Sequence, residues 1–264
     1  MNKRSLRIIL IVLFILLALG MMVFVSLSRR NNDEEVVIVD EGLYDLEHLS
    51  KDGYYRYEDE NFSSLAGIDV SEHNKNIDFK QVKDSGISFV FLRIGWRGYT
   101  EGLLYKDNYF DEYFKEARGN GLRIGVYFFS QALNEEEAIA EAKLVLEILD
   151  GVKLDLPVVY DFERIAHDEA RTDGISKEQC TRNAKAFFDT IGNKYDVMLY
   201  ANSELITDYY DMAELSGYKL WYAQYNQIPE CGYDFSIWQY TDKGEVPGIE
   251  KDTDLNIMFI EKTH

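Results

Sequence analysis

The sequence is poor in cysteine and proline, with two and three residues respectively among 264. Cys180 and Cys231 form neither a Cys-x-x-Cys pair nor a cluster with histidine at zinc-finger spacing, which argues against a structural metal site. We expect neither a metal nor a cofactor. The two cysteines could form one disulfide in an oxidising compartment, and the sequence leaves the free and the bonded states open.

Basic residues are also scarce, because 28 Lys and Arg stand against 47 Asp and Glu, which gives a formal charge of −19. Such an excess repels phosphate backbones, so nucleic acid is not an expected partner. Aromatic residues, by contrast, are plentiful, with 19 Tyr, 15 Phe and 3 Trp. This composition indicates a folded chain with a sizeable core and excludes a disordered or low-complexity chain.

One long apolar run stands near the N-terminus. Residues 8–27 are mostly apolar and long enough to span a bilayer, and no small-residue cleavage site follows before Arg29. Lys3, Arg4 and Arg7 precede the run, which places the N-terminus in the cytoplasm by the positive-inside rule. We therefore predict an uncleaved signal anchor. A buried core helix is the alternative, and it is disfavoured because such a helix seldom lacks a polar face.

The chain divides into three parts by composition. We predict a cytoplasmic tip and membrane anchor over residues 1–30, an acidic extracytoplasmic spacer over residues 31–62, and one globular domain over residues 63–264. About two hundred residues is a common size for a single barrel domain. The expected location is the cell membrane, with a single span and with the domain outside the cytoplasm. We expect the domain to act as a monomer.

From residue 66 onward, β-branched and aromatic runs alternate with amphipathic stretches. The strand candidates are 66–71, 88–94, 123–129, 156–162 and 196–201, followed by 219–226, 234–241 and 252–260. The helix candidates are 78–85, 109–120, 135–150, 176–192 and a short one near 204–215; Asn134 is expected to cap the third and Glu137 to reach back to it. Five βα units followed by three strands predict an α/β fold, an irregular TIM-like barrel. An open doubly wound sheet is the competing fold, but it explains three consecutive terminal strands less naturally.

Acidic residues stand at the ends of two predicted strands. Asp69 ends the first in GIDVS, and Asp161 and Glu163 end the fourth in VVYDFE. Residues i and i+2 of a strand face the same side, so Asp161 and Glu163 can point into one mouth of the barrel. Two carboxyls placed together raise the pKa of at least one of them, which can then keep a proton to donate. The alternative is that these are solvated loop residues, which the pair following an apolar run disfavours.

Six short motifs occur in order along this domain: GIDVSEHN (67–74), GVYFFSQA (125–132), PVVYDFE (157–163), WYAQYN (221–226), WQYT (238–241) and TDLN (253–256). Over about residues 65–262 they resemble the successive motifs of glycoside hydrolase family 25, the lysozyme-type muramidases. The resemblance implies a barrel of five βα units plus three strands, in agreement with the pattern above. It also implies hydrolysis of the β-1,4 bond between N-acetylmuramic acid and N-acetylglucosamine, with peptidoglycan glycan strands as the partner.

The resemblance further implies roles for particular residues. Glu163 resembles the general acid/base, Asp161 the group that orients the substrate's 2-acetamido group, and Asp69 and Asp254 the two further acidic residues of the site. Asp254 lies near the start of its predicted strand, so either that strand is antiparallel to its neighbours or its boundary is misplaced. The residues expected to bind the glycan are Tyr127, Tyr160, Trp221, Tyr222, Gln224 and Trp238.

Sugar rings pack on aromatic faces, but core packing is the alternative for most of these aromatic side chains. Phe128 stands where the family more often has His, which puts the detail of the subsites in doubt. His73 and His167 have no spaced partner and are not expected to bind metal.

Retention of configuration, assisted by the substrate's acetamido group, is the expected mechanism, and two other interpretations remain open. One is a catalytically weak or silent module that binds cell-wall glycan. The other is an enzyme that acts on chitin or a capsular polysaccharide, although Leu156 and Val159 break the DxxDxDxE signature of chitinases.

Overall fold

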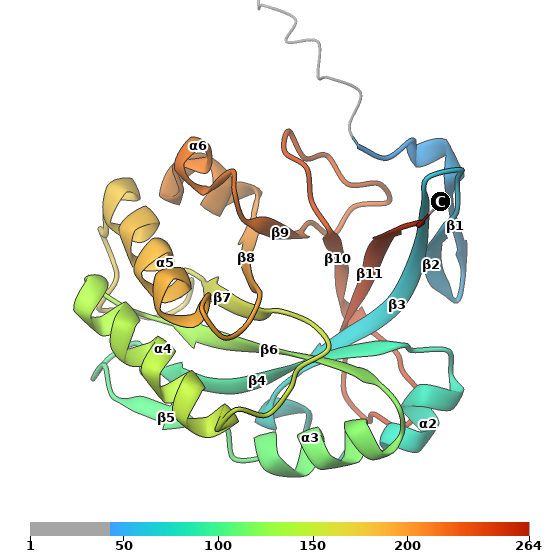
Figure 1. The fold of residues 1–264 in the computed structure, drawn as a ribbon, viewed down its shortest axis with the longest axis horizontal. Helices are drawn as coiled ribbons and strands as arrows, with labels where there is room; N and C mark the ends of the chain where they lie inside the picture. The colour runs from blue at the N-terminus through green and yellow to red at the C-terminus, as the bar shows by residue number, and fades with distance from the viewer. Residues whose placement is uncertain (1–42, 264) are drawn as a thin grey trace, which may run out of the picture. The chain divides into compact units, whose positions relative to one another are not determined.

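The computed structural model describes residues 43–263, which form an eight-stranded barrel with helices outside it (Figure 1). The predicted membrane segment, residues 8–27, lies outside this range. Within residues 43–263, none of the helices combines the length and the apolar composition that crossing a bilayer requires.

The barrel strands follow the predicted order closely. They are β3 (Phe62–Val70), β4 (Phe89–Arg97), β6 (Arg123–Ser130), β7 (Val158–Phe162), β8 (Val197–Asn202), β9 (Lys219–Ala223), β10 (Ile237–Gly244) and β11 (Thr253–Glu261). Neighbours in the sheet run β3-β11-β10-β9-β8-β7-β6-β4, and the pairing of β3 with β4 closes the ring. A short strand, β5 (Leu104–Lys106), adds to the edge of β4. The predicted α/β barrel is confirmed, and the open doubly wound sheet is excluded.

The last strand, β11, runs against the direction of the others. It pairs antiparallel with both β10 and β3, whereas the other seven barrel strands pair with one another in parallel. Asp254, the second residue of β11, therefore lies opposite Asp69, near the end of β3. The antiparallel alternative is correct, and the strand begins and ends one residue later than predicted.

The helices cover the outside of the barrel. They are α2 (Phe79–Asp84), α3 (Phe110–Gly119), α4 (Glu135–Leu149), α5 (Lys177–Ile191) and α6 (Met212–Leu215), with short turns at Glu72–Asn74 and a π-helical turn at Leu205–Tyr209. Asn134 caps α4 as predicted, because its Oδ1 accepts from the backbone N–H of Glu137 at 3.0 Å. The Glu137 carboxylate, however, accepts from the N–H of Leu133, one residue before the expected position.

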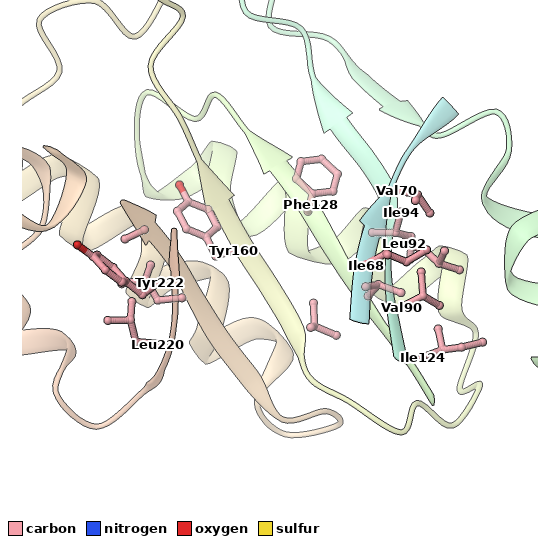
Figure 2. Packing of buried hydrophobic residues seen from close by; sticks show 14 of the residues in the cluster. Ile68, Val70, Val90, Leu92, Ile94, Ile124, Phe128, Tyr160, Leu220 and Tyr222 are labelled. Carbon is pink, nitrogen blue, oxygen red and sulfur yellow. The ribbon is translucent and has the colours of Figure 1, made fainter. Parts of the chain in front are cut away.

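Alternate residues of each barrel strand face the interior or the helices. The outward side chains pack under the helices, and Figure 2 shows several of them, among them Ile68, Val90 and Phe128. The inward set forms a separate cluster that fills the barrel: Phe89, Phe91, Val159, Met198, Tyr200, Trp221, Ala223, Ile237 and Met258. Because both faces of these strands are buried, the strands read as nearly continuous apolar runs.

Two glycines make room for the phenylalanines inside the barrel. Gly67 of β3 lies beside Phe89, and Gly125 of β6 lies beside Phe91. A Cβ at Gly67 would come within 2.2 Å of the Phe89 ring, and one at Gly125 within 2.2 Å of the Phe91 ring. The glycines of the GIDVS and GVYFF motifs are therefore required by packing.

A hairpin precedes the barrel and packs against it. It consists of a helical turn at Leu46–His48, then β1 (Leu49–Asp52) and β2 (Tyr54–Tyr57). Tyr44 stacks on Phe259 with ring centroids 3.9 Å apart, and its hydroxyl donates to the carbonyl of Phe235 at 2.7 Å. Residues 43–62 thus belong to the folded unit, although their composition led us to place them in the spacer.

We expect Gly67→Ala to destabilise the fold, because the added methyl group has no space beside the fully buried Phe89. Overpacking of this kind lowers the free energy of unfolding by roughly 1–3 kcal/mol, measurable by urea titration. Gly119→Ala is the matched control, since nothing lies within 4 Å of its added Cβ at the end of α3. Equal unfolding midpoints for the two variants would contradict this account of the interior.

Candidate active site

A cavity of about 700 Å³ opens at the carboxyl ends of the parallel strands. Asp69 reaches it from the end of β3, Asp161 from β7 and Glu163 from just beyond β7. Asp254 joins them from the start of β11, because that strand runs in the opposite direction. The structure therefore brings all four carboxyls together at one mouth of the barrel.

Asp69 is held by two amide side chains. Its Oδ2 accepts from Nε2 of Gln239 at 2.9 Å and from Nδ2 of Asn256 at 2.7 Å. These amides are oriented in turn, because the Trp221 indole donates to Asn256 at 2.8 Å and the Tyr200 hydroxyl to Gln239 at 3.0 Å. Burial raises the pKa of Asp69 to about 6, and the two hydrogen bonds oppose that rise.

Asp161 has the opposite surroundings. Its side chain is only 5 % exposed, yet Oδ1 makes no hydrogen bond within the described residues. Burial raises the pKa of Asp161 well above its usual value, and the charges of Glu163 and Asp69 raise it further, while Arg93 acts in the other direction. A buried polar atom without a partner is costly, so this oxygen is free to form a hydrogen bond with a group that enters the cavity.

Glu163 and Asp254 also keep their protons readily. Burial, followed by the charge of Asp69, raises the pKa of Glu163 from 4.5 to about 7. Burial, followed by the charges of Asp69 and Glu163, raises the pKa of Asp254 to about 9. Because the folded state binds the Glu163 proton more tightly than the unfolded state, protonation of this group contributes to the free energy of unfolding. The contribution is fully present below pH 4.5 and is lost as the pH rises through about 7.

The backbone that carries Glu163 is fixed by Gln131, which is fully buried. The Gln131 amide donates to the carbonyl of Glu163 at 2.8 Å, and its own oxygen accepts from the Thr172 hydroxyl at 2.7 Å. Arg171 donates to the carbonyl of Gln131 and forms an ion pair with Glu137 on α4. The end of β7 and the loop after it are thereby tied to the end of β6.

Arg93, whose positive charge acts on Asp161, is already engaged by other carboxylates. Its guanidinium forms ion pairs with Asp107 at 2.9 Å and Glu72 at 3.0 Å and lies 4.5 Å from the ring centre of Trp96. Arg93 therefore lowers the pKa of Asp161 by less than burial raises it. The cavity keeps an excess of carboxyl groups, and protonation relieves their repulsion.

Two of the residues predicted to bind glycan, Tyr127 and Trp221, line the cavity. Four others, Tyr160, Tyr222, Gln224 and Trp238, do not belong to its lining.

The two-residue periodicity of β-strands explains why three of these aromatic side chains do not line the cavity. Tyr160, Tyr222 and Trp238 each precede or follow an inward-facing residue and therefore point outward. The Tyr160 hydroxyl lies 2.9 Å from Oγ of Ser130 under the helices, and the Trp238 indole donates to the carbonyl of Gln224.

Several lining residues were not among the predicted site residues. Arg93, Tyr200 and Gln239 occupy inward positions of β4, β8 and β10, next to inward apolar residues two positions earlier. Alternation along those strands is a signal that could have found them once the inward face was known. The loop after β4, residues 98–101, lines the cavity too, and no pattern in its sequence indicates this. Phe128 faces outward, so the departure at that position does not touch the cavity.

The remaining polar candidates lie apart from this chemistry. His73 lines the cavity, whereas His167 is exposed. Cys180 is buried in α5, Cys231 is half-buried, and both are free thiols. Across residues 43–263, no group of three His, Cys, Asp or Glu side chains has an arrangement that could hold a metal ion.

Comparisons with known proteins agree with this geometry. The chain is 29% identical over 194 residues to the autolytic lysozyme of Clostridium acetobutylicum, an alignment that covers 73% of this chain and 55% of that protein. The structure of the spore cortex lytic enzyme SleM of Clostridium perfringens matches with a TM-score of 0.62 and 27% identity, covering 74% of this chain and 67% of that one.

The autolysin LytC of Streptococcus pneumoniae, solved in complex with a synthetic peptidoglycan ligand, shares the fold with a TM-score of 0.65 and 23% identity. That match covers 80% of this chain and 52% of LytC. The chain thus spans about half the length of both the clostridial lysozyme and LytC. The sequence model described as glycosyl hydrolases family 25 matches residues 68–249, and the chain therefore belongs to this family.

Proposed function

We propose that this chain hydrolyses the β-1,4 bond between N-acetylmuramic acid and N-acetylglucosamine in peptidoglycan, with Glu163 as general acid and base. The observation that carries the proposal is the contrast between two neighbouring carboxyls. Glu163 has a pKa of about 7 and can donate a proton, while the buried Asp161 offers an unpaired oxygen. Paired carboxyls whose surroundings differ in this way divide the work of glycoside hydrolysis.

In the first step the substrate's acetamido oxygen attacks the anomeric carbon. The glycosidic C–O bond breaks, and the proton of Glu163 goes to the leaving oxygen, so that an oxazolinium ion forms. Oδ1 of Asp161 accepts a hydrogen bond from the acetamido N–H, which orients the attacking oxygen toward the anomeric carbon.

In the second step water attacks the same carbon and opens the oxazolinium ring. Glu163, now ionised, takes a proton from that water and returns to its starting state. Each step inverts the anomeric carbon, so the product retains its configuration. Asp69, whose pKa of about 6 leaves it ionised near neutral pH, adds negative charge around the cationic intermediate and helps to keep the proton on Glu163 before the reaction. Asp254, with a pKa of about 9, stays protonated and acts as a neutral hydrogen-bonding group.

The choice of substrate rests on the relatives. One is described as an autolytic lysozyme and another was solved with a synthetic peptidoglycan ligand. Tyr127 lines the cavity, is partly exposed and offers aromatic surface to sugar rings, whereas Trp221 is only 2 % exposed and serves to orient Asn256. The competing functions are a silent module that binds wall glycan and an enzyme that acts on chitin, and the first experiment below separates them.

Glu163→Gln should lower the rate of release of reducing ends from purified peptidoglycan by about 10²–10⁴-fold, because the proton donor is lost while the shape is kept. The full chain and the variant are compared, and the digest is reduced with borohydride and analysed by mass spectrometry. Reduced N-acetylmuramic acid at the product ends is expected, and colloidal chitin should remain intact.

Glu147→Gln on the exposed face of α4 is the matched control and should cleave at the wild-type rate. No cleavage by the wild type would favour the binding module. An inverted anomer as the first product seen by NMR would exclude the retaining mechanism.

The value of kcat/KM should fall as the pH rises above about 7, because the first step needs protonated Glu163. Asp69→Asn removes a negative charge that raises the pKa of Glu163, so this fall should begin at a lower pH in the variant. A pH series of initial rates with both proteins measures the shift. A fall that stays in place, or moves to higher pH, would argue against Glu163 as the group that titrates.

We further propose that residues 8–27 anchor the chain in the cell membrane with the catalytic domain outside the cytoplasm. The protein should stay in the membrane fraction after a high-salt wash, and protease added to intact protoplasts should degrade its domain. Leu13→Arg together with Leu17→Arg should release it from the membrane, since each central arginine costs about 3 kcal/mol of insertion free energy. Recovery of the whole wild-type chain from the culture medium would contradict the anchor.

A further inference from the structure

A second cavity, of about 770 Å³, lies next to the catalytic one. Tyr225 lines both cavities. Its ring is half-exposed, and its hydroxyl donates to Oε1 of Gln239, the residue that holds Asp69. A ligand in the catalytic cavity can therefore extend past Tyr225 into the second cavity without leaving the surface of the protein.

One wall of the second cavity comes from the β1–β2 hairpin, which precedes the residues that the family model matches. Lys51, Tyr54 and Tyr55 contribute to this wall. Tyr54 shares a hydrogen bond with the Ser85 hydroxyl at 3.1 Å, and Tyr55 donates to the carbonyl of Gln227 at 2.8 Å. These two hydrogen bonds hold the hairpin wall of the cavity in a fixed position against the barrel.

The charge of this cavity differs from that of its neighbour. Two lysines, Lys51 and Lys243, line it together with one acid, Glu245. Nζ of Lys51 lies 4.8 Å from the ring centre of Tyr55 and 5.7 Å from that of Tyr240, and neither lysine has an ion pair within residues 43–263. In a chain whose formal charge is −19, two exposed lysines facing a cavity beside four carboxyls form a local site for anions.

We propose that the second cavity binds the carboxylate-bearing stem peptide that hangs from the muramic acid of the glycan strand. This inference rests on the proposed function, because the glycan must lie in the catalytic cavity. The stem peptide is attached to that glycan and carries free carboxylates, which suit Lys51 and Lys243. The side-chain amides of Asn226 and Gln227, which also line the cavity, suit a peptide backbone.

Continuity with the catalytic cavity favours the peptide over a separate anionic wall polymer. The shared residue Tyr225 places the two cavities along one ligand, and the peptide is the anionic group that is covalently joined to the sugar. The lysines therefore select strands that still carry peptides, and they act on substrate binding and not on the bond-breaking step.

The test compares kcat/KM of the full chain on peptidoglycan strands and on the same strands after an amidase has removed their peptides. The wild type should prefer peptide-bearing strands. Lys51→Glu together with Lys243→Glu should lower this preference about tenfold, mostly through KM, because exposed ion pairs are replaced by repulsion. The double alanine variant should lower it by less. Rising salt should weaken the preference in the wild type.

Lys143→Glu together with Lys194→Glu is the control, since it changes the net charge equally at exposed positions outside both cavities. It should keep the wild-type preference. An unchanged preference in the Lys51/Lys243 variants, or competition by a soluble wall phosphate polymer equal to that by free stem peptide, would overturn the inference.

A binding measurement tests the stem-peptide site separately from the proposed hydrolysis, because it does not depend on cleavage. Calorimetry with the Glu163→Gln chain and both kinds of strand should show the same preference and the same loss on lysine reversal, whether or not the wild type cleaves. If the wild type cleaves nothing but the chain still binds peptide-bearing strands preferentially, the proposed hydrolase activity is rejected and the stem-peptide site is not.

Discussion

Strand β11 pairs antiparallel with both β10 and β3. This pairing closes the barrel and also brings the carboxyl and amide side chains of the cavity together. It sets Asp254 opposite Asp69 and brings Asn256 within 2.7 Å of the Asp69 carboxylate. A parallel strand in this place would send the start of β11 to the far end of the barrel. Closure also removes the carboxyl groups from water, and this desolvation is the main cause of each raised pKa at the mouth.

The hydrogen bonds around each carboxyl then decide what it can do. Asp69 accepts from two amides and has a pKa of about 6, whereas Asp161 has an oxygen without a donor and a pKa raised well above its usual value. Glu163 has a pKa near neutrality, and its backbone is fixed by Gln131. Groups of one chemical type thus acquire separate properties from burial and from their partners.

The strand and helix order could be predicted because periodicity and helix caps are local signals. The inward or outward direction of single residues could not, because both faces of the barrel strands are buried and apolar. Tyr160, Tyr222 and Trp238 were assigned to the cavity for this reason. The hairpin of residues 43–62 was missed because its acidic composition resembles a linker, although Tyr44 and Tyr57 are buried against the barrel. Alternation identifies Arg93 only after the inward face of β4 is known, because Phe89 and Phe91 precede it at inward positions.

The pairing register also settles where the barrel begins and ends. Glu261 of β11 lies opposite Phe62 of β3. Each of them is seven residues along its own strand from the carboxyl at the cavity, Asp254 on β11 and Asp69 on β3. Both strand ends therefore lie at the rim opposite the carboxyls. The four carboxyls lie at one end of the barrel, and β11 ends at the other. A surface or a fused protein coupled near Glu261 would therefore leave the cavity open to a long polymer.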